Sequence, residues 1–316
     1  YRQTRWYGRK GAAMSAIGGV EMACWDLRGK ALGEPVARLL GAERVSVPAY
    51  ASGLLWTDDL HALAAESQRH VTNGFRRVKM RLGMSEQEDI AAVEAVRAAV
   101  GPEIDVIVDA SMRYSLPVAT RMAKVLAGLN VFWYEEPFAP EDIDNYVALR
   151  DCISVPIAAG ENEFGVQGFR ELLRAGAVDI VQPDACRAGG IGETHRVGTM
   201  AQQFGARVAT HTWSDAVALV ANAHVVAALP NGLTVEMDQT GNPFIDELLV
   251  EPLQVRDGLL TLSNRPGLGI ELDMRTVERL RVPDGTTVAD GNYSDFLWGN
   301  QHLAPAPPYR TLEPDA

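Results

Sequence analysis

Six acidic or basic residues recur along this chain at a nearly constant interval, each at the end of an apolar run typical of a β-strand. They are Asp109 in VIVDA, Glu135 in VFWYEEP, Glu161 in VPIAAGEN, Asp184 in DIVQPDA, His211 in RVATH and Glu236 in LTVEMD. Subtraction gives successive gaps of 26, 26, 23, 27 and 25 residues. A strand, a covering helix and two short loops take about that length. The spacing predicts βα units whose charged strand ends meet at one barrel mouth.

Strand-like and helix-like segments alternate through the middle of the chain. The strand candidates are 45–51, 76–82, 105–110, 131–136, 155–161, 179–185, 207–211 and 233–238. The helix candidates include 58–71, 86–100, 117–126, 166–175, 191–204 and 214–228. Eight strands with seven intervening helical segments predict a parallel sheet of barrel size. An open doubly wound sheet is the alternative, but charged residues at every strand end suit a ring better than one crevice.

The two ends of the chain differ from this alternating pattern. SAIGGVEMACWDLRGKALG predicts a helix capped by Ser15, and PVARLLG predicts a second short helix ending at Gly41. Residues from Pro243 onward contain turns and short strand-like pieces, which we expect to pack on the barrel or the N-terminal part. The Pro-rich APAPPYR predicts a loosely held tail. Because the chain opens without Met just before a mid-domain helix, we expect an N-terminal stretch to be missing from this sequence.

Composition excludes several classes of partner. The net charge is 29 − 41 = −12, which argues against nucleic acid or an anionic membrane surface as the main partner. The three cysteines show no CxxC spacing, which fits a reducing compartment, and no apolar run approaches the length of a membrane span. We therefore expect a cytoplasmic enzyme with a small-molecule substrate.

Asp109, Glu135 and Glu161 are the candidate metal ligands. Three carboxylates in one mouth would raise one another's pKa, and a divalent cation removes that penalty. Ligation by oxygen alone suits a hard ion, Mg²⁺ first and Mn²⁺ second. Salt-bridged structural acids are the alternative. Spacing alone leaves open whether Glu135 or Glu136 is the ligand.

Asp184 and His211 end neighbouring strands, so their side chains can come into hydrogen-bond contact. An Asp that accepts from one imidazole nitrogen raises the basicity of the other, which predicts a general base. Residues two apart share a face of a strand, so Lys79 and Arg81 can both point into the mouth.

These basic side chains and the last strand-end acid differ in the chemistry they permit. Lys79 can hold a carboxylate, or act as a base if its pKa is depressed. Arg81 can only bind an anion, because it does not lose its proton at working pH. Glu236 can hydrogen-bond an oxyanion if protonated and a substrate hydroxyl if ionised.

The glycines of GGIG at 189–192 do not complete a phosphate-binding pattern. We interpret them as a turn with close packing. Arg187 beside them is a candidate supporting cation.

Together these stretches resemble the enolase superfamily, in its mandelate racemase/muconate lactonizing enzyme family. The matching stretches are MSAIGGVEMACWDLRGKALG, RRVKMRLG, VDAS, WYEEP, GEN, QPDACRAGGI, ATHTW, VEMD and RPGLGIEL. The resemblance implies a (β/α)7β TIM-like barrel over 45–240, the end of an α+β capping domain over 1–44, and a C-terminal segment, 241–316, packing on both. It also implies a homo-oligomer.

For the site, the resemblance implies Mg²⁺ held by Asp109, Glu135 and Glu161. It also implies a dyad of His211 and Asp184, with Glu236 opposite. Two positions depart from the family pattern. The usual K-x-K of the second strand ends here in Arg81, and Ser111 replaces the Asn of a common D-A-N.

The implied chemistry is removal of a proton α to a carboxylate, through an enediolate intermediate. Racemisation usually needs a base on each face of the carbon, and Arg81 cannot serve as one. We therefore expect a Mg²⁺-dependent acid-sugar dehydratase, acting on an aldonate or aldarate. The alternatives are a racemase or epimerase, a sugar-lactone cycloisomerase, and an inactive barrel.

Overall fold

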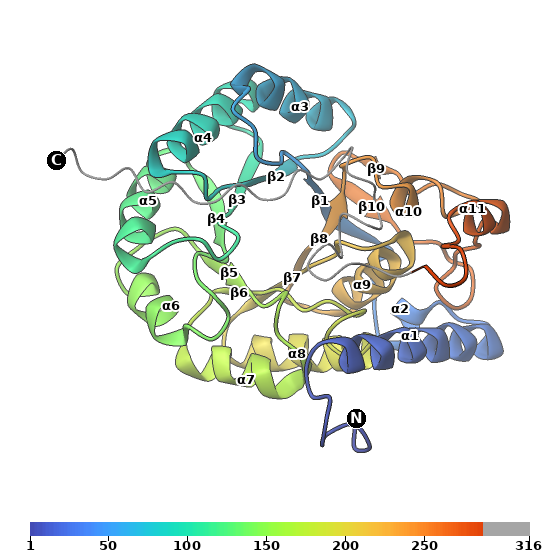
Figure 1. Cartoon of the computed structure of the whole chain (residues 1–316). Coiled ribbons are helices and arrows are strands. Elements are labelled where there is room, and N and C mark those ends of the chain that lie inside the picture. Colours follow the sequence, from blue (N-terminus) through green and yellow to red (C-terminus); the bar gives the residue numbers. More distant parts are fainter. Residues whose placement is uncertain (287–316) are drawn as a thin grey trace.

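A closed barrel of eight parallel strands forms the centre of the protein, in a computed structural model that describes residues 1–286 (Figure 1). The strand order is β2-β3-β4-β5-β6-β7-β8-β1, and pairing of β1 with β2 closes the ring. The strands are β1 Ser46–Ser52, β2 Arg77–Arg81, β3 Asp105–Asp109, β4 Val131–Glu135, β5 Ile157–Ala159, β6 Ile180–Val181, β7 Arg207–Thr210 and β8 Gly232–Asp238. The predicted TIM-like (β/α)7β barrel is confirmed.

Helices alternate with these strands and surround the barrel in Figure 1. They are α3 Leu60–Thr72, α4 Glu86–Val100, α5 Leu116–Gly128, α6 Ile143–Arg150, α7 Gly165–Ala175, α8 Ile191–Gln203 and α9 Ala216–Ala228. The six helices that the sequence bounded lie within two residues of their expected ends. Ser85 caps α4, because its hydroxyl accepts from the Glu88 N–H at 3.2 Å and donates to the Glu88 carboxylate at 2.7 Å.

The sixth strand is shorter than the predicted 179–185. It spans only Ile180–Val181, and the Gln182 N–H makes one further bond to β5, to the Ala159 oxygen at 3.0 Å. Pro183 follows, and proline has no N–H with which to continue the pairing. The chain beyond β6 therefore runs as a loop that carries Asp184 at the mouth.

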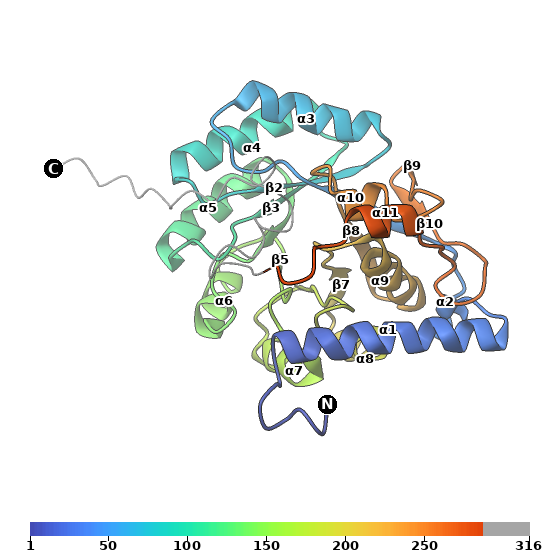
Figure 2. The same ribbon diagram turned by 45° about the vertical axis from the view of Figure 1, so that its right-hand side comes forward.

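Two N-terminal helices, α1 Ala12–Leu32 and α2 Val36–Leu39, lie against the outside of the barrel (Figure 2). The prediction that Ser15 caps α1 is wrong. The helix begins at Ala12 after Gly11, whose φ of 68° makes the turn, and it has no side-chain cap. The second helix ends at Leu39 rather than Gly41.

The N-terminal helix α1 also caps another helix. The Glu21 carboxylate accepts from the N–H groups of Ile191 and Gly192, at 2.7 and 3.0 Å, where α8 begins. A carboxylate there satisfies free backbone donors and complements the helix dipole. Gly18 is required because a Cβ would lie 2.8 Å from the Ala185 oxygen. At the start of α8, Gly189 and Gly190 have φ values of 111° and 108°, and a Cβ on Gly190 would overlap the Glu21 carboxylate, so these glycines serve a turn with close packing, as the sequence indicated.

Residues after the barrel pack on it beside α1 and α2, where the Val36 N–H donates to the Gly267 oxygen at 2.9 Å and the Leu268 N–H donates to Asp26 at 2.8 Å. They form α10 Pro243–Asp246, β9 Val255–Arg256, β10 Leu259–Thr261 and α11 Met274–Arg279. Strand β10 pairs antiparallel with the first residues of β1, with Ser46 opposite Thr261. The predicted tail APAPPYR lies outside the described residues, and the domain boundaries after residues 44 and 240 stay predictions.

An inner apolar layer fills the barrel below the mouth. Tyr50, Ile107, Trp133, Ala158, Ile180, Ala209 and Leu233 form this cluster. The barrel is therefore a packed core on which the strand ends stand. Among residues 1–286, no helix combines the length and the apolar character that a membrane crossing requires.

Candidate active site and metal centre

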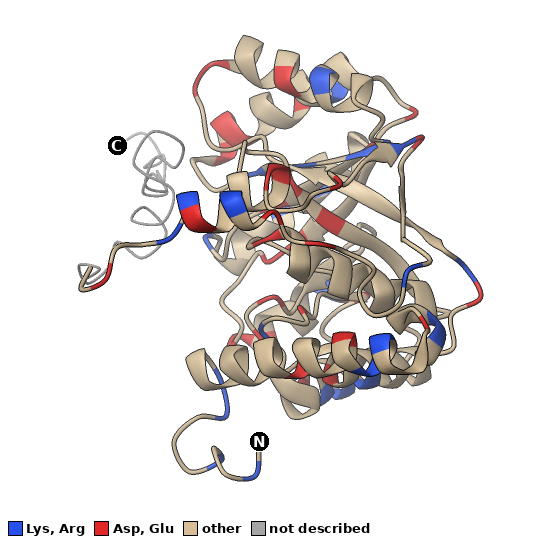
Figure 3. Ribbon diagram, turned by 90° about the vertical axis from the view of Figure 1, so that its right-hand side faces the viewer, with Lys and Arg blue, Asp and Glu red and all other residues tan. Residues whose placement is uncertain are grey.

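The strand-end residues predicted from the sequence lie together at the carboxyl end of the barrel. Arg81 is in register with Asp109, and Asp109 with Glu135, so three successive strands place them side by side. Figure 3 shows acidic segments gathered among the barrel strands. Parallel strands put equivalent ends on one side of a sheet, which is why a regular sequence spacing becomes a cluster in space.

Three carboxylates of this cluster form the candidate metal centre. Ligand atoms of Asp109, Glu135 and Glu161 all lie within 4.8 Å of one another. Asp109 and Glu135 are buried, and one oxygen of Glu161 is buried without a hydrogen-bond partner. Burial and the neighbouring acids raise the pKa of Glu135 despite the opposing charge of Lys79. A hard divalent cation fits this donor set, because it removes the repulsion among the carboxylates.

The neighbouring carboxylate, Glu136, is engaged elsewhere. The Asn162 amide donates to both of its oxygens, at 3.0 and 3.2 Å. Arg187 in turn donates to the Asn162 oxygen at 3.0 Å. Spacing left open whether Glu135 or Glu136 is the metal ligand. The structure favours Glu135, because its ligand atom belongs to the cluster with Asp109 and Glu161. Arg187 supports the site through Asn162, in line with its expected role as a supporting cation.

Lys79 occupies the centre of the acidic cluster. Its Nζ lies 2.7 Å from both Glu135 Oε1 and Glu236 Oε1, and 3.4 Å from Asp109 Oδ2. Burial lowers the pKa of Lys79, but the carboxylates raise it well above its ordinary value. The surroundings therefore favour a charged ammonium that binds an anion over a neutral base. The same ammonium lowers the pKa of buried Glu236, which favours its ionised form.

The second-strand arginine replaces the expected second lysine of the family. Arg81 donates to Asp109, and its guanidinium lies over the Trp213 ring at 5.3 Å. The Ser111 N–H donates to Asp109 at 2.8 Å, and the Ser111 hydroxyl does so at 3.3 Å. Support for Asp109 is thus retained although serine replaces asparagine.

Asp184 and His211 form the predicted dyad. His211 Nδ1 lies 2.9 Å from Asp184 Oδ2, and both side chains are buried. Burial lowers the pKa of His211, but the charge of Glu161 and the hydrogen bond to Asp184 outweigh it and raise the pKa to about 9. His211 Nε2 lies 3.8 Å from Glu161 Oε2 and therefore faces the metal centre.

Asn222, which the sequence analysis did not identify, connects the two halves of this dyad. Its amide lies 3.0 Å from Asp184 Oδ1, from the His211 carbonyl and from Thr212 Oγ1, and its oxygen accepts from the Ala185 N–H at 2.9 Å. The one signal in the sequence was an amide inside the apolar run AVALVANAHVVAA. A buried amide needs several partners, and here they are the loops that carry the dyad.

Two family descriptions match the sequence. "Enolase C-terminal domain-like" spans residues 62–276, and "Mandelate racemase / muconate lactonizing enzyme, N-terminal domain" spans residues 1–41. The chain belongs to the mandelate racemase/muconate lactonizing enzyme family of the enolase superfamily.

Known members of the family resemble the chain over most of its length. D-galactarolactone cycloisomerase of Agrobacterium fabrum is 36% identical over 296 residues, which are 90% of this chain and 78% of that protein. Arabinonate dehydratase of Saccharolobus solfataricus is 35% identical, over 85% of this chain and 73% of that protein. A racemase from Streptomyces coelicolor, crystallised with bound magnesium, has a TM-score of 0.81 at 30% identity, over 89% of this chain and 77% of its own.

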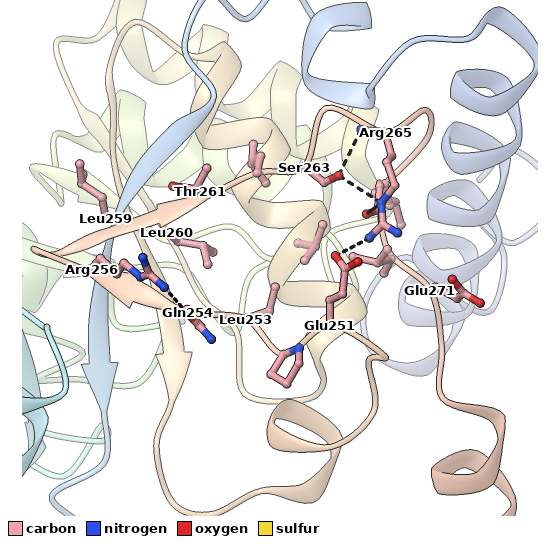
Figure 4. A pocket seen from close by; sticks show the side chains of 16 residues that line it. Glu251, Leu253, Gln254, Arg256, Leu259, Leu260, Thr261, Ser263, Arg265 and Glu271 are labelled. Atoms are coloured by element: carbon pink, nitrogen blue, oxygen red, sulfur yellow. Dashed lines mark hydrogen bonds and ion pairs between the residues drawn. The ribbon is translucent and has the colours of Figure 1, made fainter.

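A cavity of about 450 Å³ lies away from this centre, among the residues that follow the barrel (Figure 4). It is lined by β10, which pairs with the beginning of β1 and so lies toward the opposite end of the barrel. Figure 4 shows Arg265 directed at Glu251 and Arg256 directed at Gln254. Each arginine donates to its partner at 2.9 Å. Both arginines that line the cavity are thus engaged, and it offers no grouping comparable to the mouth.

Proposed function

We propose that the protein is a Mg²⁺-dependent dehydratase of an acid sugar, an aldonate or aldarate, and gives a 2-keto-3-deoxy product. The observation that carries this proposal is one His–Asp dyad facing a three-carboxylate centre, with an arginine in place of a second base. Relatives named as sugar-acid dehydratases, such as arabinonate dehydratase, support the same reaction.

Asp109, Glu135 and Glu161 would hold the cation, Mg²⁺ first and Mn²⁺ second. The ion would supply positive charge that stabilises the enediolate formed after proton removal. Lys79 would bind the substrate carboxylate, because its raised pKa keeps the ammonium charged. Arg81 would assist, held in place by Asp109 and the Trp213 ring.

His211 is the proposed base. Its Nε2 accepts the proton from the carbon next to the carboxylate, while Asp184 holds Nδ1 and fixes the tautomer. The bond between the next carbon and its hydroxyl oxygen then breaks, and the departing hydroxide takes a proton and leaves as water. The resulting enol becomes the 2-keto-3-deoxy acid. Once it has taken the proton, the His211 imidazolium can also act as the acid on the leaving group.

Glu236 would accept a hydrogen bond from a substrate hydroxyl. Its lowered pKa favours the carboxylate, and the Thr212 N–H donates to its Oε2 at 2.9 Å. This fixed orientation leaves its charge directed into the mouth beside Lys79.

A sugar-lactone cycloisomerase is the second candidate. The 36% identity to D-galactarolactone cycloisomerase favours it, because the same base and the same cationic groups serve both reactions. Epimerisation remains a third outcome of the same proton removal, and an inactive barrel is the non-enzymatic alternative.

One experiment separates these reactions. The full-length protein is incubated with Mg²⁺ and a panel of aldonic acids, aldaric acids and their lactones in D₂O, and the protons are followed by NMR. A deuterated C3 methylene with loss of the C2 proton supports dehydration. Deuterium at C2 without elimination indicates epimerisation, and opening or rearrangement of a lactone indicates cycloisomerisation. The absence of any reaction across the panel would contradict the proposal.

A further inference from the structure

Gln182 is a buried side chain of the barrel for which the mechanism above has no role. Its exposed fraction is 0%, and neither its amide nitrogen nor its amide oxygen has a hydrogen-bond partner among residues 1–286. Its backbone is ordinary, since the Gln182 N–H donates to the Ala159 oxygen at 3.0 Å. Buried amides are rarely left without partners in native proteins, so each exception calls for an explanation.

The strand register places Gln182 in the catalytic layer of the barrel. Ile180, two residues earlier, belongs to the inner apolar cluster, and alternation along a strand directs Gln182 to the same interior side. Glu135 is in register with Ala158 of β5, and Ala158 is in register with Ile180 of β6. Gln182 therefore lies two residues closer to the mouth than the β6 residue that is in register with Glu135.

From each even-numbered strand to the next, the register shifts by the same two residues. In such barrels, side chains from alternate strands fill one interior layer. The four members of this layer are Lys79, Glu135, Gln182 and Glu236.

The other three members of the layer already bind one another, whereas Gln182 does not join them. Lys79 lies 2.7 Å from each of the two glutamates. On the neighbouring strand, the residue that follows β5 is Gly160, which contributes no side chain beside Gln182. The fourth position of the catalytic layer thus presents an unpaired amide inside the barrel.

The chemistry of an amide indicates what it binds. Lys79 offers donors only and the glutamate oxygens that face it accept, whereas Gln182 offers both a donor and an acceptor from one planar group. A hydroxyl group also donates and accepts, so it matches an amide better than a carboxylate or a cation does. We propose that Gln182 binds a hydroxyl group of a polyhydroxy acid substrate, an inference that rests on the proposed function.

The proposal predicts opposite effects on stability and on catalysis. An unpaired amide destabilises the free protein, so an apolar replacement of similar shape should raise the melting temperature. Loss of a bound hydroxyl should weaken substrate use. A glutamine with a structural role would behave differently, because its replacement would lower the melting temperature.

The test compares Gln182→Met with Gln202→Met, in which an exposed glutamine on α8 undergoes the same change. For Gln182→Met, we expect a melting temperature about 2 °C higher by calorimetry and a kcat/KM about 10 to 100-fold lower. Gln202→Met should change neither. A lower melting temperature, or an unchanged kcat/KM, overturns the proposal.

Deoxy analogues of the substrate assign the hydroxyl. The analogue that lacks the bound hydroxyl should lose kcat/KM in the wild type, and Gln182→Met should then cause no further loss. An equal loss with every analogue overturns the assignment. If the wild type turns over no sugar acid, the proposed function fails separately. The role of Gln182 is then decided by binding. The dissociation constant of the tightest-binding sugar acid is measured for Gln182→Met and Gln202→Met, and equal values overturn the proposal for Gln182.

Discussion

Two buried histidines of the barrel, His211 at the mouth and His224 at the joint with the C-terminal segment, respond to burial in opposite ways. The pKa of His211 is raised to about 9, because the charge of Glu161 and the Asp184 contact outweigh burial. The pKa of His224 is lowered to about 4, because burial dominates and only weaker interactions oppose it. Burial alone therefore does not set the pKa of a histidine; the charges around the ring decide the direction of the shift.

His224 shows what a structural histidine does here. Its Nδ1 accepts from the Ala37 N–H at 3.0 Å, and its Nε2 lies 3.1 Å from the Leu268 carbonyl and donates to it. The neutral ring thus ties α2 and the C-terminal segment to α9. At the mouth, uncompensated acids leave the site ready for a cation, whereas at the joint every polar atom of the ring is satisfied within the fold.

The largest effect is expected at the mouth. His211→Asn should lower turnover about 100 to 10,000-fold, because the amide cannot accept the substrate proton. The measurement is kcat on the substrate identified by NMR, with Mg²⁺ affinity by calorimetry as the control. Near-normal turnover would show that His211 does not differ in kind from His224.

A lower pH should destabilise the fold through His224 at the joint. The unfolded chain binds more protons than the folded protein between the folded pKa of His224, about 4, and its ordinary value of 6.5. The stability from neutral His224 is therefore complete above pH 6.5 and falls as pH drops toward 4, by about 3 kcal/mol in total. His224→Gln keeps an acceptor and a donor but cannot titrate. Denaturant unfolding at several pH values should show a flatter profile for this variant; parallel profiles would contradict the prediction.

Magnesium should stabilise the protein through the carboxylates of the mouth and not through the joint at His224. At 100 times its dissociation constant, Mg²⁺ should add about 2.7 kcal/mol to the free energy of unfolding. Glu161→Gln should reduce this gain by weakening ion binding, whereas His224→Gln should keep it. Melting temperatures with and without Mg²⁺ give the comparison, and an equal gain in Glu161→Gln would remove Glu161 from the ligand set.

The smallest effect is expected at Asn222, on the helix that also carries His224. Asn222→Ala leaves the Ala185 N–H and Asp184 Oδ1 short of a partner and should destabilise the protein by about 1 to 3 kcal/mol. Turnover should fall because Asp184 and His211 lose a shared anchor. His224→Gln, measured in parallel by the same unfolding and turnover assays, should leave turnover unchanged. A normal kcat in Asn222→Ala would limit Asn222 to a role in stability.

The barrel and the position of the strand-end residues could be predicted from the sequence, because both depend on local periodicity. A strand followed by a helix repeats at a fixed length, so Asp109, Glu135 and Glu161 could be placed at one end without coordinates. The choice between Glu135 and Glu136 needed the positions of neighbouring side chains, since Asn162 engages one of them.

Residues that act through distant contacts escaped prediction. Asn222 stands in an apolar helix, and its partners lie on loops 10 to 38 residues away in sequence. Glu21 caps a helix that begins 170 residues later. The mistaken cap at Ser15 has a local cause, because a favourable capping residue can also lie within the first turn when a glycine turn starts the helix earlier.

The pairing of β10 with β1 bears on how the protein is made. Ser46, Val47 and Pro48 lie opposite Thr261, Leu260 and Leu259, residues that leave the ribosome long after the first strand has emerged. Until then, the beginning of β1 lacks its partner strand, and such an edge can pair with other chains. Synthesis of the final barrel strand therefore does not complete the fold: a nascent chain that stalls before residue 259 still presents an open edge to chaperones or to its neighbours.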